Sequence, residues 1–321
     1  MHEMPQPIST LARPRIAVLI PCYNEEVAIP GVVEAFRAAL PEAEILVYDN
    51  NSKDRTVEVA REAGATVRRE TLQGKGNVVR RMFADIEADV YVLVDGDDTY
   101  DAAAAPEMVR MLLDERLDMV TGVRVTEIQA AYRPGHRFGN LMLTGMVRVV
   151  FGDRISDMLS GYRAFSRRFV KSFPALAEGF ETETEFTVHA LELKMPVGEV
   201  KTAYKDRPPG SASKLNTIRD GIRILRTILG LIRRERPLAF FGGISAVLLV
   251  GAGILFLPVL ATYLTTGLVP RFPSFIASAT LAMLSFLSLC CGLILDTVTR
   301  GRREARRIAY LAVPGPGALR G

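Results

Sequence analysis

Four aspartates lie within seven positions of this 321-residue chain, at the end of an apolar run. The run Val90–Val94 leads directly into Asp95, Asp97, Asp98 and Asp101. Such a run is typical of a buried parallel strand, and α/β proteins bind ligands at the carboxyl ends of such strands. Because clustered carboxylates repel one another unless a cation joins them, the spacing indicates a divalent metal whose shell is completed by substrate phosphates. A solvated acidic turn is the alternative interpretation.

Two earlier loops carry further polar groups. Asp49 follows the apolar segment Glu44–Tyr48 and could accept hydrogen bonds from a ribose or a base edge. Its neighbours Ser52, Asp54 and Thr56 are predicted to cap a helix. Gly74-Lys75-Gly76 opens another predicted helix and would offer backbone N–H groups and one ammonium to an anion. This loop lacks the spacing of a Walker motif, so a plain turn is the alternative.

The elements that must position these loops alternate along the chain. Apolar runs predict strands over residues 15–20, 44–48, 65–69, 90–94 and 118–123, and helical spacing predicts helices over 29–40, 56–62, 74 onward and 106–115. Alternating strands and helices favour parallel strands joined by right-handed crossovers. The polar loops should therefore gather along one edge of a mostly parallel α/β sheet flanked by helices.

Together, four motifs resemble the nucleotide-sugar half of the family 2 glycosyltransferases, which have the Rossmann-like GT-A fold. They are Pro21-Cys22-Tyr23-Asn24-Glu25-Glu26, Asp49 to Thr56, Gly74-Lys75-Gly76 and Asp95-Gly96-Asp97, in the order and at the spacing of the family. The resemblance continues through Gly122-Val123-Arg124, Ser160 to Phe165 and Tyr204 to Lys214, and it covers roughly residues 15–215. Among these enzymes the chain is most similar to the polyprenyl-phosphate, dolichol-phosphate-type transferases.

The resemblance implies a role for each matched position. Those that would frame the nucleoside, usually uridine or guanosine, are Pro21, Tyr23, Glu25 and Asp49, and Lys75 would lie near the nucleotide. Asp95 and Asp97 would hold Mg²⁺ or Mn²⁺ on the diphosphate, which makes Asp97 a catalytic candidate. Arg124, Arg207 and Lys214 would bind the acceptor phosphate; a solvated charge at a strand end is the alternative for Arg124.

The motif departs from the dolichol-phosphate mannose synthases in one place. Those enzymes commonly continue it with Leu-Gln-His, whereas this chain continues with Asp98-Thr99-Tyr100-Asp101. The departure leaves the third metal ligand and the identity of the sugar open.

Several other polar residues are weaker candidates. Arg133 and Arg137 could bind the same phosphate, whereas His136 lacks any partner at metal-ligand spacing and is interpreted as a loop residue. Arg163 could point to the active site or form a structural salt bridge. Either Glu181 or Glu183 could face the sugar, in a segment whose pattern fits a strand or the start of a helix with glutamates in its first turn.

The last third of the chain is basic and then apolar. Residues 201–236 hold ten Lys/Arg and three Asp/Glu, a net charge of +7, while the remainder sums to −3. Residues 215–236 combine apolar residues at helical spacing with arginines, which predicts an amphipathic helix lying in a membrane interface; a core-facing helix is the alternative. Leu238–Leu264 and Pro273–Leu295 carry no charge and are long enough to cross a bilayer.

These patterns predict five segments: a disordered N-terminus (1–14), a cytosolic GT-A catalytic domain (15–214), the interfacial helix (215–236), two transmembrane helices (237–297) and a cytosolic basic tail (298–321). Residues 1–15 contain no apolar stretch typical of a signal peptide, and the three cysteines show no disulfide or zinc spacing. Basic residues flank both spans on one side, which places the catalytic domain and both termini in the cytoplasm of a cell with the protein in its inner membrane. Gly242, Gly243, Gly251 and Gly253 could support a homo-oligomer.

The expected function is inverting, metal-dependent transfer of a sugar from a UDP- or GDP-sugar to a polyprenyl phosphate. The membrane is expected as a further partner, and no nucleic acid is expected to bind. Such a step would serve the synthesis of cell-envelope glycans. Two alternatives remain open. One is a family 2 transferase that uses a glycolipid, polysaccharide or protein acceptor. The other is a non-catalytic membrane scaffold of the same fold.

Overall fold

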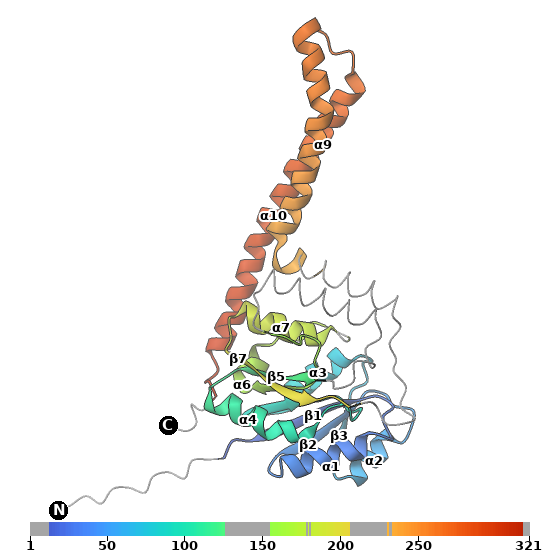
Figure 1. The fold of residues 1–321 in the computed structure, drawn as a ribbon, viewed down its shortest axis with the longest axis vertical. Coiled ribbons are helices and arrows are strands. Elements are labelled where there is room, and N and C mark those ends of the chain that lie inside the picture. The colour runs from blue at the N-terminus through green and yellow to red at the C-terminus, as the bar shows by residue number, and fades with distance from the viewer. Residues whose placement is uncertain are drawn as a thin grey trace, which may run out of the picture. The chain divides into compact units, whose positions relative to one another are not determined.

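The computed structural model describes residues 13–125, 155–177, 179, 181–205, 230 and 233–316. Contacts divide the chain into two compact units. The first comprises Met1–Thr217 together with Arg306–Gly321, and the second comprises Ile218–Ala305. In Figure 1 the first unit is an α/β sheet with helices and the second is a pair of long helices.

The first unit is built on a seven-stranded sheet in the order β3-β2-β1-β4-β6-β5-β7. Its strands are β1 Ile16–Cys22, β2 Glu44–Asp49, β3 Thr66–Arg69, β4 Val90–Leu93, β5 Met119–Val125, β6 Arg163–Ser166 and β7 Val197–Ala203. Only β6 is antiparallel to its neighbours, which are β4 and β5. The predicted mostly parallel sheet is therefore confirmed, with β6 and β7 as strands that the sequence pattern did not predict.

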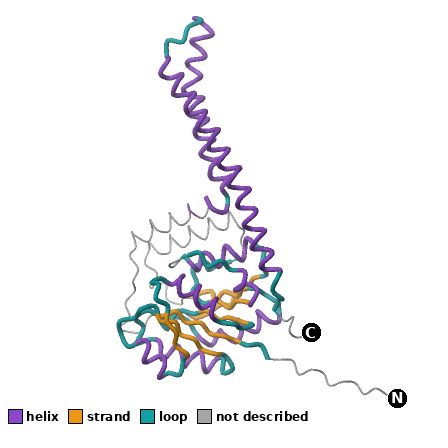
Figure 2. Tube along the Cα trace, turned by 180° about the vertical axis from the view of Figure 1, so that it is seen from behind, coloured by secondary structure: helices purple, strands orange, loops and turns teal. Residues whose placement is uncertain are grey.

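Helices cover both faces of this sheet (Figures 1 and 2). On one face lie α1 Ile29–Ala39, α2 Thr56–Glu62 and α4 Ala105–Asp114, the last preceded by the short 3₁₀ helix η1 Ala102–Ala104. On the other face lie α3 Lys75–Asp85, α6 Arg167–Ser172 and α7 Thr182–Glu192. The flanked sheet predicted for the fold class is thus observed.

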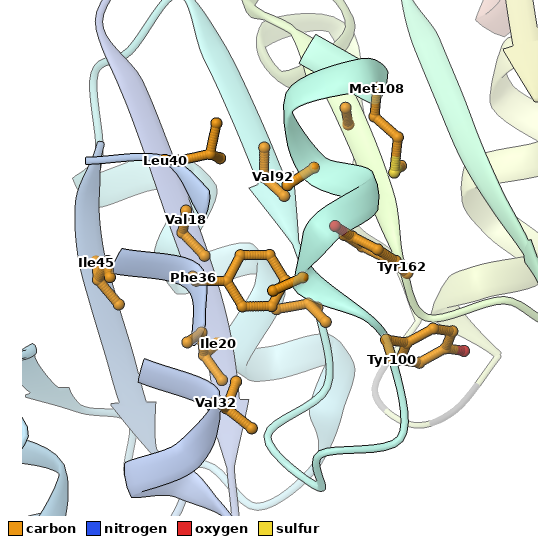
Figure 3. Close-up of a cluster of buried hydrophobic side chains, with 14 of the residues drawn as sticks. Val18, Ile20, Val32, Phe36, Leu40, Ile45, Val92, Tyr100, Met108 and Tyr162 are labelled. Atoms are coloured by element: carbon orange, nitrogen blue, oxygen red, sulfur yellow. The ribbon is translucent and has the colours of Figure 1, made fainter. Parts of the chain in front are cut away.

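The two hydrophobic clusters of the core follow from the alternation of side chains along β1. Val18 and Ile20 face the cluster under α1 and α4, whereas Ala17 and Leu19 face the cluster under α3, α6 and α7. Figure 3 shows Phe36 of α1 pointing toward Val18 and Ile20. Burying a side chain of this size stabilises the fold by roughly 1.5–3 kcal/mol. The sheet is therefore held rigidly from both sides, which fixes the loops at its edges.

The segment that could have been a strand or a helix start is the helix α7. Glu183 and Glu185 lie in its first turn, where the helix dipole favours negative charge. Glu185 also accepts hydrogen bonds from the backbone N–H groups of Leu176 (3.0 Å) and Ala177 (2.9 Å). Glu183 instead pairs with Lys75. In a strand the two glutamates would point to the same face, whereas in the helix they reach different partners.

A buried histidine in α7 predicts a pH-dependent stability. Burial, with a smaller contribution from Arg306, lowers the pKa of His189 from 6.5 to about 3. Because the folded pKa lies below the unfolded one, the stability contributed by neutral His189 is fully present above pH 6.5 and is lost as the pH falls toward 3. We expect the melting temperature, measured by circular dichroism, to decrease as the pH is lowered from 7 to 5.

The slope of this loss should not exceed about 1.4 kcal/mol per pH unit. His189→Gln is the matched variant, since it keeps a polar group near the hydroxyl of Ser172, which lies 3.1 Å from the imidazole. The variant should flatten the pH dependence of the midpoint between pH 7 and pH 5. An unchanged slope would mean that other groups cause the acid sensitivity.

The second unit contains most of two helices that are long and apolar enough to cross a membrane, α9 Pro237–Thr266 and α10 Phe272–Leu311. Gly267, with φ of 66°, ends α9 in the left-handed conformation. The buried small residues of the pair recur every seven positions: Ser245, Ala252 and Val259 in α9, and Ser278, Ser285, Gly292 and Thr299 in α10. A hydrogen bond of 2.9 Å joins the hydroxyls of Ser245 and Ser285. Seven-residue spacing is the pattern of helices that pack along their whole length.

The helix α10 is longer than the predicted span and continues through the basic residues that follow it. Its last turns belong to the first unit, where Tyr310 donates a hydrogen bond to Asp118 (2.8 Å) and Arg306 to Glu192 (2.6 Å). The start of the predicted tail, through Leu311, is therefore helical. The predicted interfacial helix lies mostly outside the described residues.

Candidate active site

The loops after β1 and β2 brace each other at the carboxyl edge of the sheet. The backbone N–H of Asn24 donates to Ser52 Oγ (2.9 Å), and that of Glu25 to Thr56 Oγ1 (2.9 Å). The side chain of Asn24 accepts a bond from the backbone of Lys53 (2.8 Å). The N-cap residue of α2 is Arg55, which makes no side-chain capping bond. Of the three predicted capping residues, Asp54 accepts the backbone N–H of Thr56, the first residue of α2 (3.1 Å). Ser52 and Thr56 instead hold the loop that carries Tyr23 and Glu25.

The end of β2 ties the loop before α3 into the same edge. The side chain of Asn50 accepts a hydrogen bond from the N–H of Gly74 (2.7 Å) and donates to the carbonyls of Glu70 (3.0 Å) and Leu72 (2.8 Å). Asp49 beside it is 2% exposed and accepts a bond from the N–H of Ser52 (3.1 Å). The sequence reasoning selected Asp49 and passed over Asn50, whose amide bonds to several backbone groups become visible only in the fold.

The two aspartates that follow β4 differ in their surroundings. Asp97 is 7% exposed, and its Oδ1 accepts bonds from Thr99 Oγ1 (2.6 Å) and the N–H of Thr99 (3.3 Å). The Asp95 side chain is 29% exposed. Between them, a Cβ on Gly96 would lie 2.5 Å from Cys22 Sγ, so only glycine allows this turn to pack on β1.

The thiol of Cys22 reports how closely the acidic groups converge. Burial raises its pKa well above the ordinary value, and four carboxylates raise it further: Glu25, Asp49, Asp95 and Asp97. These groups come from the ends of β1, β2 and β4, which are neighbours in the sheet. The strand register pairs Cys22 with Asp49, and Gly96 packs on the Cys22 thiol, so the structure brings Asp49, Asp95 and Asp97 to one edge of the sheet, where the loop of Glu25 also begins. Pro21 lies beside Cys22 within β1.

Lys75, the first residue of α3, lies between two carboxylates. Its Nζ is 2.5 Å from Asp95 Oδ1 and also pairs with Glu183 of α7. Burial alone would lower the pKa of Lys75, but Asp95 and Glu183 raise it above its ordinary value. The predicted ammonium is thus present at the helix start, after Gly74 with φ of 129°, but it is bound to carboxylates of the chain itself.

Asp95 and Asp97 are the carboxylates that could bind a divalent metal at this edge. Among the described residues, no group of three or more His, Cys, Asp or Glu side chains could hold a metal by itself. Asp95 and Asp97 supply carboxylate oxygens, the ligands preferred by Mg²⁺ and Mn²⁺, and such ions commonly complete their shell with phosphates and water. The residues therefore fit a metal that is bound together with a diphosphate. Of the third-ligand candidates, Thr99 donates to Asp97, and Asp101 accepts a bond from the N–H of Ala103 (3.0 Å).

Arg124 at the end of β5 is held by a carboxylate. Its guanidinium makes two hydrogen bonds to Asp157, of 2.7 and 2.8 Å, and lies 5.5 Å from the ring centre of Tyr204. A bidentate pair of this kind fixes the orientation of the guanidinium. The predicted phosphate ligands Arg207 and Lys214 lie outside the described residues, as do Arg133, His136 and Arg137.

Gly161 is a site residue whose role the sequence did not reveal. Its N–H donates to the hydroxyl of Tyr100 (2.8 Å), and a Cβ placed on it would lie 2.3 Å from Asp95 Oδ2. The structure shows a close approach of the backbone to a carboxylate here.

Arg163 is fully buried. It donates to the carbonyls of Met158 (2.7 Å) and Ser160 (3.1 Å) and to Thr187 Oγ1 (3.0 Å). These bonds to carbonyls and a hydroxyl are not the expected salt bridge, and the expected active-site role stays a prediction.

Three comparisons bear on this site. A family model described as Glycosyl transferase family 2 matches residues 17–173. Glycosyltransferase AglJ of Haloferax volcanii is 35% identical over 236 residues, which cover 72% of this chain and 76% of that protein. The dolichyl-phosphate hexose transferase of the same organism is 28% identical over 222 residues, covering 69% of this chain and 95% of that protein.

Among solved structures, glucosyl-3-phosphoglycerate synthase from Mycobacterium tuberculosis, in complex with Mn²⁺, uridine diphosphate and phosphoglyceric acid, aligns with a TM-score of 0.55 and 22% identity. The alignment covers 68% of this chain and 78% of that chain. At this identity the likeness shows a shared fold.

Proposed function

Because the chain belongs to glycosyl transferase family 2, we propose that it transfers a sugar from a UDP- or GDP-sugar to a polyprenyl phosphate at a membrane surface. The observation that carries the proposal is the gathering of carboxylates at one sheet edge. Asp49 is the register partner of Cys22, Gly96 between Asp95 and Asp97 packs on the Cys22 thiol, and the loop of Glu25 is bonded to Thr56 after β2. A structural neighbour that binds Mn²⁺ and uridine diphosphate supports the donor, and a dolichyl-phosphate hexose transferase among the relatives supports the acceptor.

The donor side of the site would work through positioning and charge. Asp49, Tyr23, Glu25 and Pro21 would frame the nucleoside, and Lys75 would lie beside the diphosphate. Asp95 and Asp97 would hold Mg²⁺ or Mn²⁺, which, when bound, stabilises the charge of the leaving nucleotide diphosphate. The rigid sheet edge supplies the fixed geometry that this stabilisation needs.

On the acceptor side, no general base is required, because a polyprenyl phosphate is already an anionic oxygen nucleophile at neutral pH. Arg124, Arg207 and Lys214 would hold this phosphate in line with the anomeric carbon. The phosphate oxygen forms the new bond to that carbon as the bond to the nucleotide diphosphate breaks, so the configuration is inverted. In this role Arg124 would act while bound by Asp157.

We also propose the membrane arrangement predicted from the sequence. The helices α9 and α10 would span the inner membrane with the catalytic domain and both termini in the cytoplasm. The basic segment 215–236 would lie at the same surface, close to an anionic lipid acceptor. Cysteine labelling of a variant in which Thr265 is replaced should show this residue accessible only from the outer side, and labelling from the cytoplasmic side would contradict the arrangement.

The acceptor is tested by following labelled sugar into the lipid phase. The full chain in detergent is incubated with labelled UDP- and GDP-sugars and Mn²⁺, with and without undecaprenyl phosphate. We expect label in the organic phase only when both one donor class and the lipid phosphate are present. Label in a protein or polysaccharide fraction that does not depend on the lipid phosphate would instead support a different acceptor.

A further inference from the structure

The contact of Lys75 with two carboxylates has a consequence for how the site accepts its ligands. Lys75 Nζ pairs with Asp95 Oδ1 at 2.5 Å and with Glu183, which lies 108 positions further along the chain. Its side chain is 10% exposed. An ammonium this deeply buried is stabilised by its carboxylate partners, since removing them would leave an uncompensated charge.

Glu183 is the more deeply buried of the two carboxylates that pair with Lys75. It is 5% exposed, and its second oxygen, Oε2, is buried without a hydrogen-bond partner among the described residues. The charge of Glu183 is therefore compensated mainly through the oxygen that pairs with Lys75. The backbone holds the two residues together, because a Cβ on Gly76 would lie 2.0 Å from the carbonyl oxygen of Ala177 and 2.8 Å from Thr182 Oγ1.

Asp95, in contrast, has a more exposed side chain, and each of its two carboxylate oxygens has a different neighbour. One oxygen binds Lys75, and the other lies against Gly161. A divalent metal bound by Asp95 would compete with the ammonium, since both are cations that seek the same carboxylate. A diphosphate that arrives with the metal would in turn offer the ammonium a new anionic partner.

We propose that Lys75 is an exchangeable internal cation: it neutralises Asp95 in the free enzyme, stays anchored to Glu183, and passes from Asp95 to the donor diphosphate when the metal and nucleotide bind. Glu183 is then a positioning residue, which acts through Lys75. This inference rests on the proposed function, because it needs a metal and a diphosphate at Asp95. It would make metal and nucleotide bind cooperatively, since each removes an obstacle to the other.

The test measures Mn²⁺ binding directly, by the electron paramagnetic resonance signal of free Mn²⁺, with and without uridine diphosphate as the probe. Without nucleotide, Lys75→Met should bind Mn²⁺ about tenfold more tightly than the unchanged chain, because the competing ammonium is gone. The strengthening of Mn²⁺ binding by uridine diphosphate should fall by about the same factor. Lys53→Met, an exposed lysine in the loop after β2, is the matched control for loss of one positive charge and should stay within about twofold.

A second variant covers the case in which Lys75→Met fails to fold. In Glu183→Gln the ammonium loses one of its two carboxylate partners among the described residues and keeps Asp95, so Mn²⁺ binding without nucleotide should weaken. Opposite shifts in the two variants support the exchange, whereas equal or parallel shifts overturn it. If the unchanged chain binds no Mn²⁺ even with uridine diphosphate, the metal of the proposed function is rejected together with this inference.

Discussion

Asp97→Asn is expected to reduce the rate of sugar transfer on the order of 10³-fold, which corresponds to about 4 kcal/mol of transition-state stabilisation. The amide is almost the same size as the carboxylate, and its oxygen can still accept the bonds from Thr99. The fold should therefore be kept while the negative charge toward the metal is lost. Initial rates with labelled donor, measured over a range of Mn²⁺ concentrations, give the loss and show whether excess metal restores part of it.

Asp114→Asn is the matched control for this result. Asp114 is the exposed last residue of α4, and its replacement removes one carboxylate charge with almost no change in side-chain size. We expect its activity to stay within about twofold of the unchanged chain. If Asp97→Asn keeps more than a tenth of the activity, the Asp97 carboxylate is not an essential metal ligand. Absence of sugar transfer by the unchanged chain would instead support the non-catalytic scaffold.

Gly161→Ala is expected to lower the rate of transfer by about 100-fold with little change in stability. A Cβ on this residue would lie 2.3 Å from Asp95 Oδ2, and the atoms that must move are the end of the Asp95 side chain. Moving a carboxylate tip costs the fold little, but a displacement of about 1 Å at a reacting site can cost 10²-fold in rate. Circular dichroism melting and donor kinetics, measured on the same preparation, separate the two effects.

Gly31→Ala provides the comparison for Gly161→Ala. Gly31 lies in the first turn of α1, where a new Cβ would find its nearest atom, Asp98 Oδ2, at an ordinary 4.0 Å. Alanine within a helix should raise stability by about 0.4–1 kcal/mol and leave the transfer rate unchanged. If the loss of activity in Gly161→Ala is accompanied by a clear decrease in melting temperature, its effect is on folding and not on the placement of Asp95.

The sequence determined much of the scaffold because its signals are local. The apolar run that ends at Val94 and the helical spacing over residues 29–40 predicted a strand and a helix that the structure confirms in β4 and α1. The order of the four motifs identified the family, which the comparisons support. The lengths of the uncharged segments predicted two long helices. Each of these inferences needs only neighbouring residues, whose periodicity and turn chemistry are set by backbone geometry.

Only the tertiary structure decided which polar groups meet. Glu183 reaches Lys75 across 108 positions, and Asp157 holds Arg124 across 33. The glycine at 161 matters because a distant carboxylate lies where its side chain would be. Pairings of this kind depend on the order of strands in the sheet, including the antiparallel β6 between β4 and β5, and no local pattern encodes that order. The sequence thus located the acidic cluster, whereas the fold showed that a lysine already occupies part of it.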